Sequence, residues 1–469
     1  MTTLHRRALL RAMATWTAMP AFAQHPEPSD DAFLADLERR TFDWFWETAD
    51  PDSGLTPDRW PTPSFCSIAA VGFALSAYII GVERRYITRV QARQRSLKVL
   101  SFLASLPQGP QSKGVAGHKG FFYHFLDIRT GLRFDRCELS TADTSLLLMG
   151  VLHCANTFDE DHSEERDIRR LAKLLVERVE WPWAQVRGES ICHGWSPEGG
   201  FIPSDWKGYN EAMMVYLLAL GSPTHPVAPA AWAAWTSTYD SSSWTTRYGQ
   251  PQLFFAPLFG HLFTHCWVDF RGIRDAYLRK RDPTGALDYF ENSRRAVYAQ
   301  QAHARANPDG WAGYDALVFG VSACDGPADV TREYGGKLRR FISYAGRGMG
   351  LYDDGTLTPY AVGGAVPFAP EIAIPALRTM RARYPLVWGR YGFFDAFNPS
   401  FTFTDVKLTH GRVDSGTGWV DTDYLGIDQG PMLLLLANHR DEVVWRMMRR
   451  DPLLRRGLKR AGFEGAWLS

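Results

Sequence analysis

The chain has 469 residues, and its 52 Lys and Arg against 51 Asp and Glu give a formal net charge of +1 at pH 7. This charge gives no reason to expect nucleic acid or an anionic membrane as a partner, because either normally leaves a basic footprint. With 22% charged and 45% hydrophobic residues, the composition is that of a soluble globular protein. The aromatic content of 13% indicates a large core together with a ring-lined groove.

The N-terminal stretch has the features of an export signal. Arg6 and Arg7 are followed by a weakly apolar run and by an Ala-Phe-Ala tripeptide that ends at position 23, as in a cleavage site. The paired arginines favour the twin-arginine route, with an ordinary secretory signal as the alternative. We therefore expect residues 1–23 to be a signal peptide and the mature chain to be exported to a bacterial periplasm or beyond. The sequence has no run of about 20 apolar residues, so a membrane anchor is not predicted.

Hydrophobic periodicity predicts a helical chain. Residues 31–49 carry apolar side chains at helical spacing, with Asp30 or Asp31 as the cap. Segments that are apolar on all sides then alternate with amphipathic ones, which predicts pairs of a buried inner helix and a half-exposed outer helix. In chain order, these pairs are residues 67–82 with 87–106, 140–155 with 164–179, 209–220 with 229–239, and 252–269 with 287–305. Residues 367–383 and 427–448 complete the set, and the last segment is expected to break at Asn438 and His439.

Strand-like alternation is rare by comparison, although residues 121–134 predict two short strands or an extended arm. Roughly ten to twelve paired helices fit an all-α fold, an α/α toroid, better than a sandwich or an α/β sheet. No compositional boundary divides residues 24–469, so we expect one domain. Long loops rich in Gly and aromatic residues would form a cleft at one end of the toroid. These loops are residues 114–123, 194–208, 310–327, 350–364 and 389–418.

The cysteine and histidine pattern does not predict a metal centre. The chain has six cysteines, none in a C-x-x-C pair, which indicates neither a zinc site nor a disulfide framework. One or two disulfide bridges could form in an oxidising compartment, but a chain of this size can fold without them. His225 and His265 lack a second ligand at helical spacing, so both are predicted to be structural.

The most informative acid lies in residues 191–226. Glu211 stands where a loop rich in Gly and aromatic residues becomes the apolar run AMMVYLLALG, in the first turn of the expected helix. The helix dipole favours an acid there, so Glu211 could serve only as a cap. Trp195, Trp206 and Tyr209 crowd the same loop, and sugar sites stack pyranose faces on such rings while carboxylates bind the hydroxyls. The pattern favours the floor of an active site.

Eight segments carry a resemblance to known proteins. In the order in which they occur along nearly the whole mature chain, they are TFDWFWETADPDSGLTPDRW, SIAAVGFALSAYIIGVERRYITRVQA, STADTSLLLMG, WKGYNEAMMVYLLALGSPTHP, FTHCWVDFRG, DGTLTPYAVGGAVPFAPEIAI, YGFFDAFNP and GIDQGPMLLLLANHR. They resemble the bacterial glycoamylase-like family, whose characterised members include endo-β-1,2-glucanases and whose relatives form a domain of cyclic β-1,2-glucan synthases. The resemblance implies an (α/α)6 barrel, activity on a β-linked glucan, no obligatory metal and an inverting hydrolysis.

Inverting hydrolysis needs two carboxyl groups roughly 6.5–9.5 Å apart, one protonated for the leaving oxygen and one ionised to activate water. The family pattern GYNEA makes Glu211 the candidate acid, and burial among aromatic rings would raise its pKa as that role requires. Asp143 in STADTS is the first candidate for the base, with Glu138 as its neighbour. Capping of a helix is the alternative role for both, and a sugar hydroxyl or a relay could activate the water instead.

Other polar and aromatic residues are candidates for sugar binding, and for each of them a place in the core or in an ion pair is the alternative. Besides the three rings named above, they are Trp267, Asp269, Arg271, Trp311, Tyr314, Asp325, Asp395, Asn398 and Asp428. Glu371 and Gln429 lie beside or within apolar helices and are expected to be buried with polar partners.

We interpret the chain as an exported glycoside hydrolase that acts on β-1,2-linked glucan without a cofactor. The first alternative is an exo-acting glycosidase or a transglycosylase on another β-glucan. The second is a periplasmic glycan-binding protein that has lost catalysis. A uronate lyase on an α/α barrel would need a basic groove, which the near-neutral charge does not favour.

Overall fold

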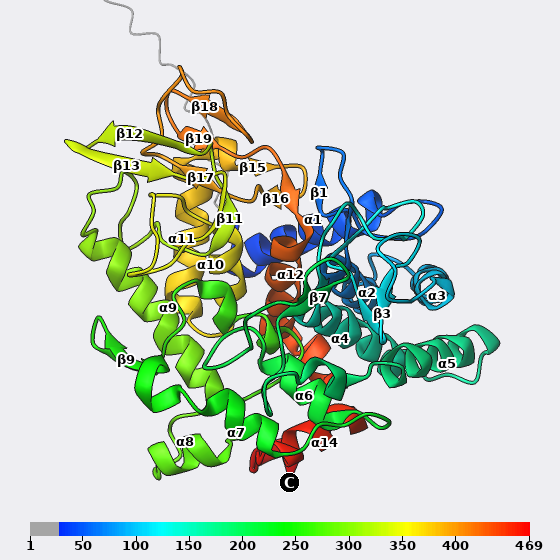
Figure 1. Cartoon of the computed structure of the whole chain (residues 1–469). Coiled ribbons are helices and arrows are strands. Elements are labelled where there is room, and N and C mark those ends of the chain that lie inside the picture. Colours follow the sequence, from blue (N-terminus) through cyan, green and yellow to red (C-terminus); the bar gives the residue numbers. More distant parts are fainter. Residues whose placement is uncertain (1–27) are drawn as a thin grey trace, which may run out of the picture.

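The computed structural model describes residues 28–469, of which helices account for about 45%, and this part of the chain contains 14 α-helices. Figure 1 shows how they are arranged. The predicted signal peptide, residues 1–23, lies outside the described residues. The expected all-α class is confirmed, whereas a closed toroid of six helix pairs stays a prediction. Across the described range, no helix is both long enough and apolar enough to cross a membrane.

Five helices are buried over most of their length, because they are apolar on nearly every side. They are α2 (Ile68–Glu83), α4 (Thr141–Thr157), α6 (Met213–Gly221), α10 (Pro359–Ala365) and α12 (Gly426–Asp441). α4 packs on α2 and α6, and α12 packs on α2 and α10. Two glycines allow α2 and α4 to approach closely. A Cβ atom at Gly72 would lie 2.2 Å from the Leu146 carbonyl oxygen, and one at Gly150 would lie 2.0 Å from the Gly72 carbonyl oxygen.

The other helices are more exposed and pack around these five. They are α1 (Asp30–Thr48), α3 (Arg89–Ser105), α5 (Ser163–Glu177), α7 (Ala230–Thr236), α8 (Ala276–Arg281), α9 (Tyr289–Ala306), α11 (Pro370–Arg383), α13 (Val443–Met448) and α14 (Pro452–Arg460). α1 packs on α2 and α12, α3 on α2, α5 on α4, α7 and α14 on α6, and α11 on α10. This alternation of buried and half-exposed helices agrees with the sequence prediction.

Two predicted helix ends are corrected. The side chain of Ser29, rather than Asp30 or Asp31, caps α1, and the two acids lie in the first turn, where the helix dipole favours them. The break in the last helical segment falls at Glu442, whose φ is +60°, and not at Asn438. The Asn438 side chain accepts backbone N–H groups from the start of α13, so it caps the next helix.

Two segments differ in type from their predictions. Residues 252–269 contain no α-helix. They hold the end of a strand and two short 3-10 helices, Leu258–His261 and Thr264–Cys266. Pro257 precedes the first of these and has no N–H group to donate to a preceding turn. Conversely, α10 lies partly within residues 350–364, which were predicted as a loop because of their Gly and Pro content.

Twenty short strands lie in the loops of the described chain, and all their ladders are antiparallel. The first ten are β1 (Arg59–Trp60), β2 (Cys66–Ser67), β3 (Gly117–His118), β4 (Phe121–Phe122), β5 (Phe125–Leu126), β6 (Leu139–Ser140), β7 (Gly194–Ser196), β8 (Gly200–Phe201), β9 (Trp244–Arg247) and β10 (Gln250–Leu253). The rest are β11 (Ala323–Asp325), β12 (Val330–Tyr334), β13 (Lys337–Phe341), β14 (Tyr344–Gly346), β15 (Trp388–Gly389), β16 (Gly392–Phe393), β17 (Phe397–Asn398), β18 (Arg412–Asp414), β19 (Gly418–Val420) and β20 (Tyr424–Leu425).

The strands fix the loops at the starts of buried helices. β2, β6 and β20 run directly into α2, α4 and α12, and they pair with β5, β7 and β1 respectively. β4 and β5 confirm the two strands predicted in residues 121–134, although they pair with β3 and β2 and not with each other. Segments far apart in the sequence therefore meet where these helices begin.

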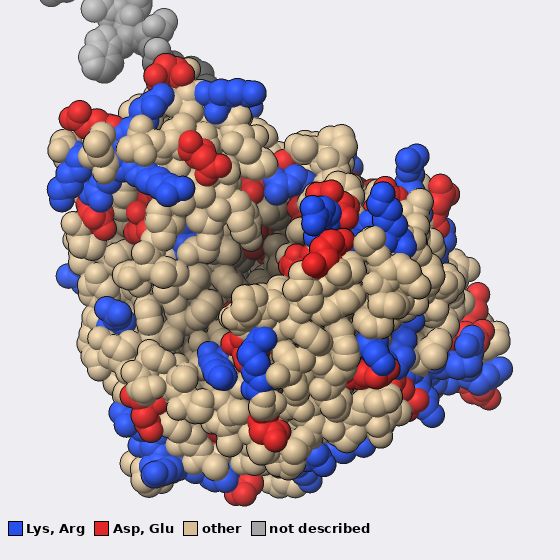
Figure 2. Space-filling view, in the orientation of Figure 1, with Lys and Arg blue, Asp and Glu red and all other residues tan. Residues whose placement is uncertain are grey.

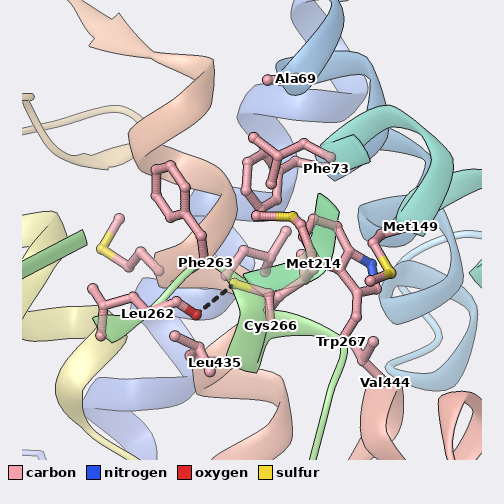
Figure 3. Close-up of a cluster of buried hydrophobic side chains, with 14 of the residues drawn as sticks. Ala69, Phe73, Met149, Met214, Leu262, Phe263, Cys266, Trp267, Leu435 and Val444 are labelled. Carbon is pink, nitrogen blue, oxygen red and sulfur yellow. Dashed lines mark hydrogen bonds between the residues drawn. The ribbon is translucent and has the colours of Figure 1, made fainter. Parts of the chain in front are cut away.

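Side chains from several helices meet in the core, including Phe73 of α2 and Met149 of α4 (Figure 3). Trp267 lies in the same cluster. Its ring stacks on Phe73 with the centroids 5.0 Å apart, and its indole N–H donates to the Ser76 hydroxyl oxygen. Because Trp267 is fully buried, its ring has no face open to a sugar. Cys266 in this cluster is a free thiol, as are the other five cysteines.

Candidate active site

Acids mark the starts of three buried helices. Asp143 lies in the first turn of α4 and Asp428 in the first turn of α12. α6 begins at Met213, so Glu211 stands just before the helix and not in its first turn as predicted. The molecular surface is hollowed near the centre of the face that Figure 2 shows, with acidic atoms at the edge of the hollow and inside it.

Glu211 is strongly affected by burial. Its Oε2 atom is buried and has no hydrogen-bond partner among the described residues. Burial disfavours the charged form and raises the pKa of Glu211 to about 7, and the negative charge of Asp143 acts in the same direction. The residue as a whole is only partly buried, so a ligand can reach it. A carboxyl group with this pKa retains its proton close to neutrality and can donate it.

Asp143 has the opposite environment. Its Oδ2 atom accepts the Ser140 hydroxyl at 2.5 Å, and its backbone N–H donates to the same hydroxyl oxygen at 3.1 Å. Its Oδ1 atom lies 3.4 Å from Nε2 of His124. The first turn of a helix also favours negative charge. These donors stabilise Asp143 as a carboxylate beside the protonated Glu211.

Glu138 and His124 extend this group. His124 Nδ1 lies 2.8 Å from Glu138 Oε1, and the imidazole ring stacks on Phe125 at a centroid distance of 3.9 Å. Burial lowers the pKa of His124, but Asp143, Glu138 and Asp58 outweigh burial and raise the pKa to about 9. Sequence analysis missed His124, and its only signal was one titratable residue in the aromatic run FFYHF. The first acid group therefore consists of Glu211, Asp143, His124 and Glu138.

A second acid group is built from Asp325, Asp395, Asp421 and Asp428. The first three each offer one carboxylate oxygen, and these oxygens lie within 4.8 Å of one another. All four side chains are buried. Burial and the neighbouring carboxylates raise the pKa of Asp395 and Asp421, and burial raises that of Asp428 to about 7. Asp58 acts electrostatically on both His124 and Asp325, so the two groups are neighbours.

Carboxylate oxygens at this spacing suit hard cations such as Ca²⁺ or Mg²⁺. Two features nevertheless balance the charge of the second acid group without an ion. Arg59 donates to both carboxylate oxygens of Asp325, at 2.5 and 3.4 Å. The raised pKa values also keep protons on Asp395 and Asp421. The group fits a buried ion pair with shared protons at least as well as a cation site, and a protein without an obligatory metal stays a prediction.

Tyr344 adds an aromatic ring to the second acid group. The residue is 53% exposed, but its hydroxyl end is buried, and that burial, together with the carboxylates of Asp428, Asp395 and Asp58, raises the pKa of the hydroxyl. It pairs directly with Asp325 across the β11–β14 ladder. An exposed ring beside buried carboxylates can stack on a sugar whose hydroxyls those carboxylates accept. Sequence analysis named neither Tyr344 nor Arg59.

The three rings predicted from the Glu211 loop divide into two kinds. Trp206 is partly exposed, and its indole N–H donates to the Thr141 hydroxyl oxygen at the start of α4, at 2.9 Å. Trp195 is also partly exposed. Tyr209 is buried and stacks on Tyr289 with the centroids 6.0 Å apart, so little of its ring is open to a ligand.

The remaining predicted sugar contacts are held in ion pairs or in packed loops. Asp269 accepts from both Arg271 and Arg449, an ion pair near the C-terminal helices. Three further candidates have protein partners: Trp311 is buried against Tyr334, the Tyr314 hydroxyl donates to Asp353, and the Asn398 amide donates to the Asp354 carbonyl oxygen. Only Asp325, Asp395 and Asp428 of this set come together in one group.

Glu371 and Gln429 test expectations about burial, whereas His265 and His225 are predicted to be structural. Glu371 is exposed on α11 and bonds Tyr298, which corrects the prediction that it is buried. Gln429 is buried as predicted, and its amide donates to the Phe393 carbonyl oxygen. His265 is buried against Ser293, whereas His225 is exposed.

Two neighbouring carboxyl groups, one protonated and one ionised, form the constellation typical of glycoside hydrolases. The sequence profile of the Glycoamylase family, described as "Putative glucoamylase", matches residues 203–452. That match covers more than half of the chain, so the protein belongs to this family, which confirms the resemblance found in the sequence.

Individual relatives agree with the family assignment. A protein of the same description from Bacteroides uniformis has a solved structure with 27% sequence identity and a TM-score of 0.79, covering 95% of this chain and 100% of that one. An endo-β-1,2-glucanase from Chitinophaga pinensis, solved with sophorotriose and glucose, has 24% identity and a TM-score of 0.77, covering 94% of this chain and 100% of its own. At that identity the likeness shows the fold alone.

A curated relative from Parabacteroides distasonis is an exo β-1,2-glucooligosaccharide sophorohydrolase acting at the non-reducing end. It is 27% identical over 464 residues, which cover 92% of this chain and 58% of the relative. The protein therefore spans little more than half the length of that relative.

Proposed function

We propose that the protein is a glycoside hydrolase that cleaves β-1,2-linked glucan with inversion, with Glu211 as the general acid. The observation that carries the proposal is the buried Oε2 atom of Glu211, which has no hydrogen-bond partner within residues 28–469, in a carboxyl group whose pKa burial raises to about 7. The protonated Glu211 gives its proton to the leaving glycosidic oxygen, and the C–O bond at the anomeric carbon breaks.

Asp143 is the proposed base. As a carboxylate it accepts a proton from water, and the resulting hydroxide attacks the anomeric carbon from the face opposite the leaving group. Alternatively, a sugar hydroxyl could stand between Asp143 and the water. That hydroxyl would take the proton from the water and give its own proton to Asp143. Glu138 is bound to His124 at 2.8 Å, so we place it behind Asp143 and not at the reacting bond.

The proposed substrate rests on the relatives. The curated relative acts on β-1,2-glucooligosaccharides, and the Chitinophaga protein of the same fold is an endo-β-1,2-glucanase. We propose endo attack on linear chains, with the exo mode of the curated relative as the alternative. The partly exposed rings of Trp206, Trp195 and Tyr344 are the proposed platforms for glucose units.

The proposal also includes the architecture of the protein and its location in the cell. We propose a single domain, residues 24–469, folded as an (α/α)6 toroid, in which residues 258–266 take the place of a sixth inner helix between α6 and α10. Packing of the 3-10 helix Thr264–Cys266 on α12 supports this placement. We further propose export to the periplasm through a twin-arginine signal in residues 1–23. A mature N-terminus at Gln24, read by mass spectrometry of the native protein, would test the export signal.

The test of function is hydrolysis of linear β-1,2-glucan by the mature protein and by Glu211→Gln, with product length and anomer followed by NMR. The proposal expects short β-1,2-oligomers from the wild type, first as the α-anomer, and almost none from the variant. Release of only one oligomer length would favour the exo alternative. Binding without cleavage by the wild type would favour a glycan-binding protein, and equal activity of both proteins would remove Glu211 from the mechanism.

A further inference from the structure

His124 lies between two carboxylates, one at each ring nitrogen. Nδ1 is 2.8 Å from Glu138 Oε1, and Nε2 is 3.4 Å from Asp143 Oδ1. A neutral imidazole has one N–H group and one lone pair, so one of these contacts would set a lone pair against a carboxylate oxygen. The imidazolium has two N–H groups and can donate to both acids.

We propose that His124 is a positioning residue, an imidazolium that joins Glu138 to Asp143 and keeps Asp143 ionised beside Glu211. Its catalytic meaning rests on the proposed function, since Asp143 is there the base. Its charge, however, can be measured without any substrate.

The surroundings of Asp143 and His124 agree with this role. Both oxygens of Asp143 face donors, Oδ2 the Ser140 hydroxyl and Oδ1 the His124 ring. The carboxylate form therefore satisfies its contacts without a proton. The ring of His124 stacks on Phe125 at an interplanar angle of 18°, which limits its rotation. His124 thus has both a fixed orientation and a fixed pair of partners.

The charged groups that face His124 come from several parts of the chain. They are Glu138 just before β6, Asp143 in α4 and Asp58 just before β1. Three carboxylates outweigh the loss of hydration and raise the pKa of His124 to about 9. The hydrogen bond from His124 lowers the pKa of Glu138, and the positive charge of Arg133 acts in the same direction.

In this arrangement His124 and Glu211 hold protons, whereas Asp143 does not. The imidazolium stabilises the negative charge of Asp143, and that charge in turn disfavours ionisation of Glu211. Acid and base are thereby set to opposite protonation states by one side chain that does not touch the substrate. Loss of the imidazolium would remove the positive charge that faces Oδ1 of Asp143.

The first test is an NMR titration of the folded protein with ¹⁵N-labelled histidine. The His124 signals are assigned by their loss in His124→Gln, and His225→Gln serves as the control because His225 is exposed. We expect both ring nitrogens of His124 to stay protonated through pH 8, and Glu138→Gln to lower its pKa by about 1–3 units. Loss of one ring proton below pH 7 in the wild type would overturn the proposal.

The second test is kinetic and uses β-1,2-glucan. We expect His124→Gln to lower kcat by roughly 10- to 100-fold with little change in KM. The acidic limb of its pH–kcat profile should move up by about 1–3 units. A merely structural role would reduce the amount of folded enzyme, seen by circular dichroism, but leave the shape of the profile unchanged, and that result would contradict the proposal.

The two tests separate this inference from the proposed function. If the wild type does not cleave β-1,2-glucan, the proposed function fails, while the titration still decides whether His124 is an imidazolium. If Gln at position 124 prevents folding, Glu138→Gln retains the ring, and its titration and pH profile replace those of the first variant. An unchanged His124 pKa in Glu138→Gln would overturn the proposed link between the two residues.

Discussion

The two acid groups at the helix starts handle buried charge in different ways. In the first, His124 is hydrogen-bonded to Glu138 and lies 3.4 Å from Asp143, while Glu211 has a buried oxygen without a partner among residues 28–469. Neighbouring acids are thereby pushed toward opposite protonation states. Such unequal neighbours are the arrangement that acid–base catalysis needs.

In the second group, the pKa values of Asp395, Asp421 and Asp428 all rise, and Arg59 is the cation paired with Asp325. Acids that are shifted in the same direction can share protons and bind hydroxyls, but they do not form an acid–base pair. The comparison shows that the number of buried acids does not identify the catalytic residues. The catalytic pair is identified by the difference between the environments of its two acids.

Removal of the charge of Asp143 should break the first acid group most severely. We expect Asp143→Asn to lower kcat on β-1,2-glucan by about 10²- to 10⁴-fold. The alkaline limb of the pH profile should move to lower pH, because the charge of Asp143 no longer raises the pKa of Glu211. Asp161→Asn is the control, since that side chain is 95% exposed. If the pH profile of Asp143→Asn were identical to that of the wild type, the charge of Asp143 would not influence the pKa of Glu211, which would contradict the prediction.

Removal of Arg59 should break the second acid group through stability. Arg59→Gln leaves the buried Asp325 without its arginine partner and with only the ring of His410 at 3.7 Å, so we expect the free energy of unfolding to fall by about 3–5 kcal/mol. Arg332→Gln removes an ion pair to the exposed Asp405 and should cost at most about 1 kcal/mol. Urea denaturation at pH 7 measures both. Equal losses would mean that Asp325 does not depend on Arg59.

The burial of Glu211 should be visible in stability as a function of pH. Its pKa is near 4.5 when unfolded and about 7 when folded, so the stability present below pH 4.5 is lost as pH rises through 7. Glu211→Gln does not ionise. Relative to wild type, we expect it to gain up to about 3 kcal/mol in the free energy of unfolding above pH 7, and to show no such gain at pH 4. A difference that does not vary between pH 4 and 8 would contradict the shifted pKa.

The smallest effect concerns Tyr344. If its exposed ring stacks on a glucose unit, Tyr344→Ala should raise KM by roughly fivefold, equivalent to about 1 kcal/mol, with kcat nearly unchanged. Tyr344→Phe retains the ring and should behave as wild type. A loss in both variants would assign the effect to the hydroxyl group and its carboxylate neighbours instead.

Much of the helical framework can be predicted from the sequence. α2 and α4 are apolar on all sides, and a serine at the N-cap of each helix marks where it begins. The sequence indicates Glu211 and Asp143 as candidates for the same reason, because an acid at the start of an apolar helix is conspicuous. The sequence does not predict α10, since its Gly-Gly pair and its Pro have the composition of a loop, and in the structure this helix packs against α11 and α12.

The contacts between distant loops could not be predicted. His124 meets Asp143 because Tyr123 forms a bridge with Leu139 in β6 and the His124 backbone N–H donates to the Glu138 carbonyl oxygen, and no periodicity encodes that short pairing. Arg59 reaches Asp325 across 266 residues of chain. Local sequence therefore predicts which acids stand at helix starts, whereas the partners that set their protonation come from elsewhere in the fold.

The central claim is that Glu211 donates a proton to the leaving group. The most direct test compares Glu211→Gln on linear β-1,2-glucan and on a 4-nitrophenyl β-sophoroside, whose leaving group needs little protonation. We predict a loss of about 10²- to 10⁴-fold on the glucan and a much smaller loss on the nitrophenyl substrate. Equal losses on both substrates would contradict the role of Glu211 as general acid.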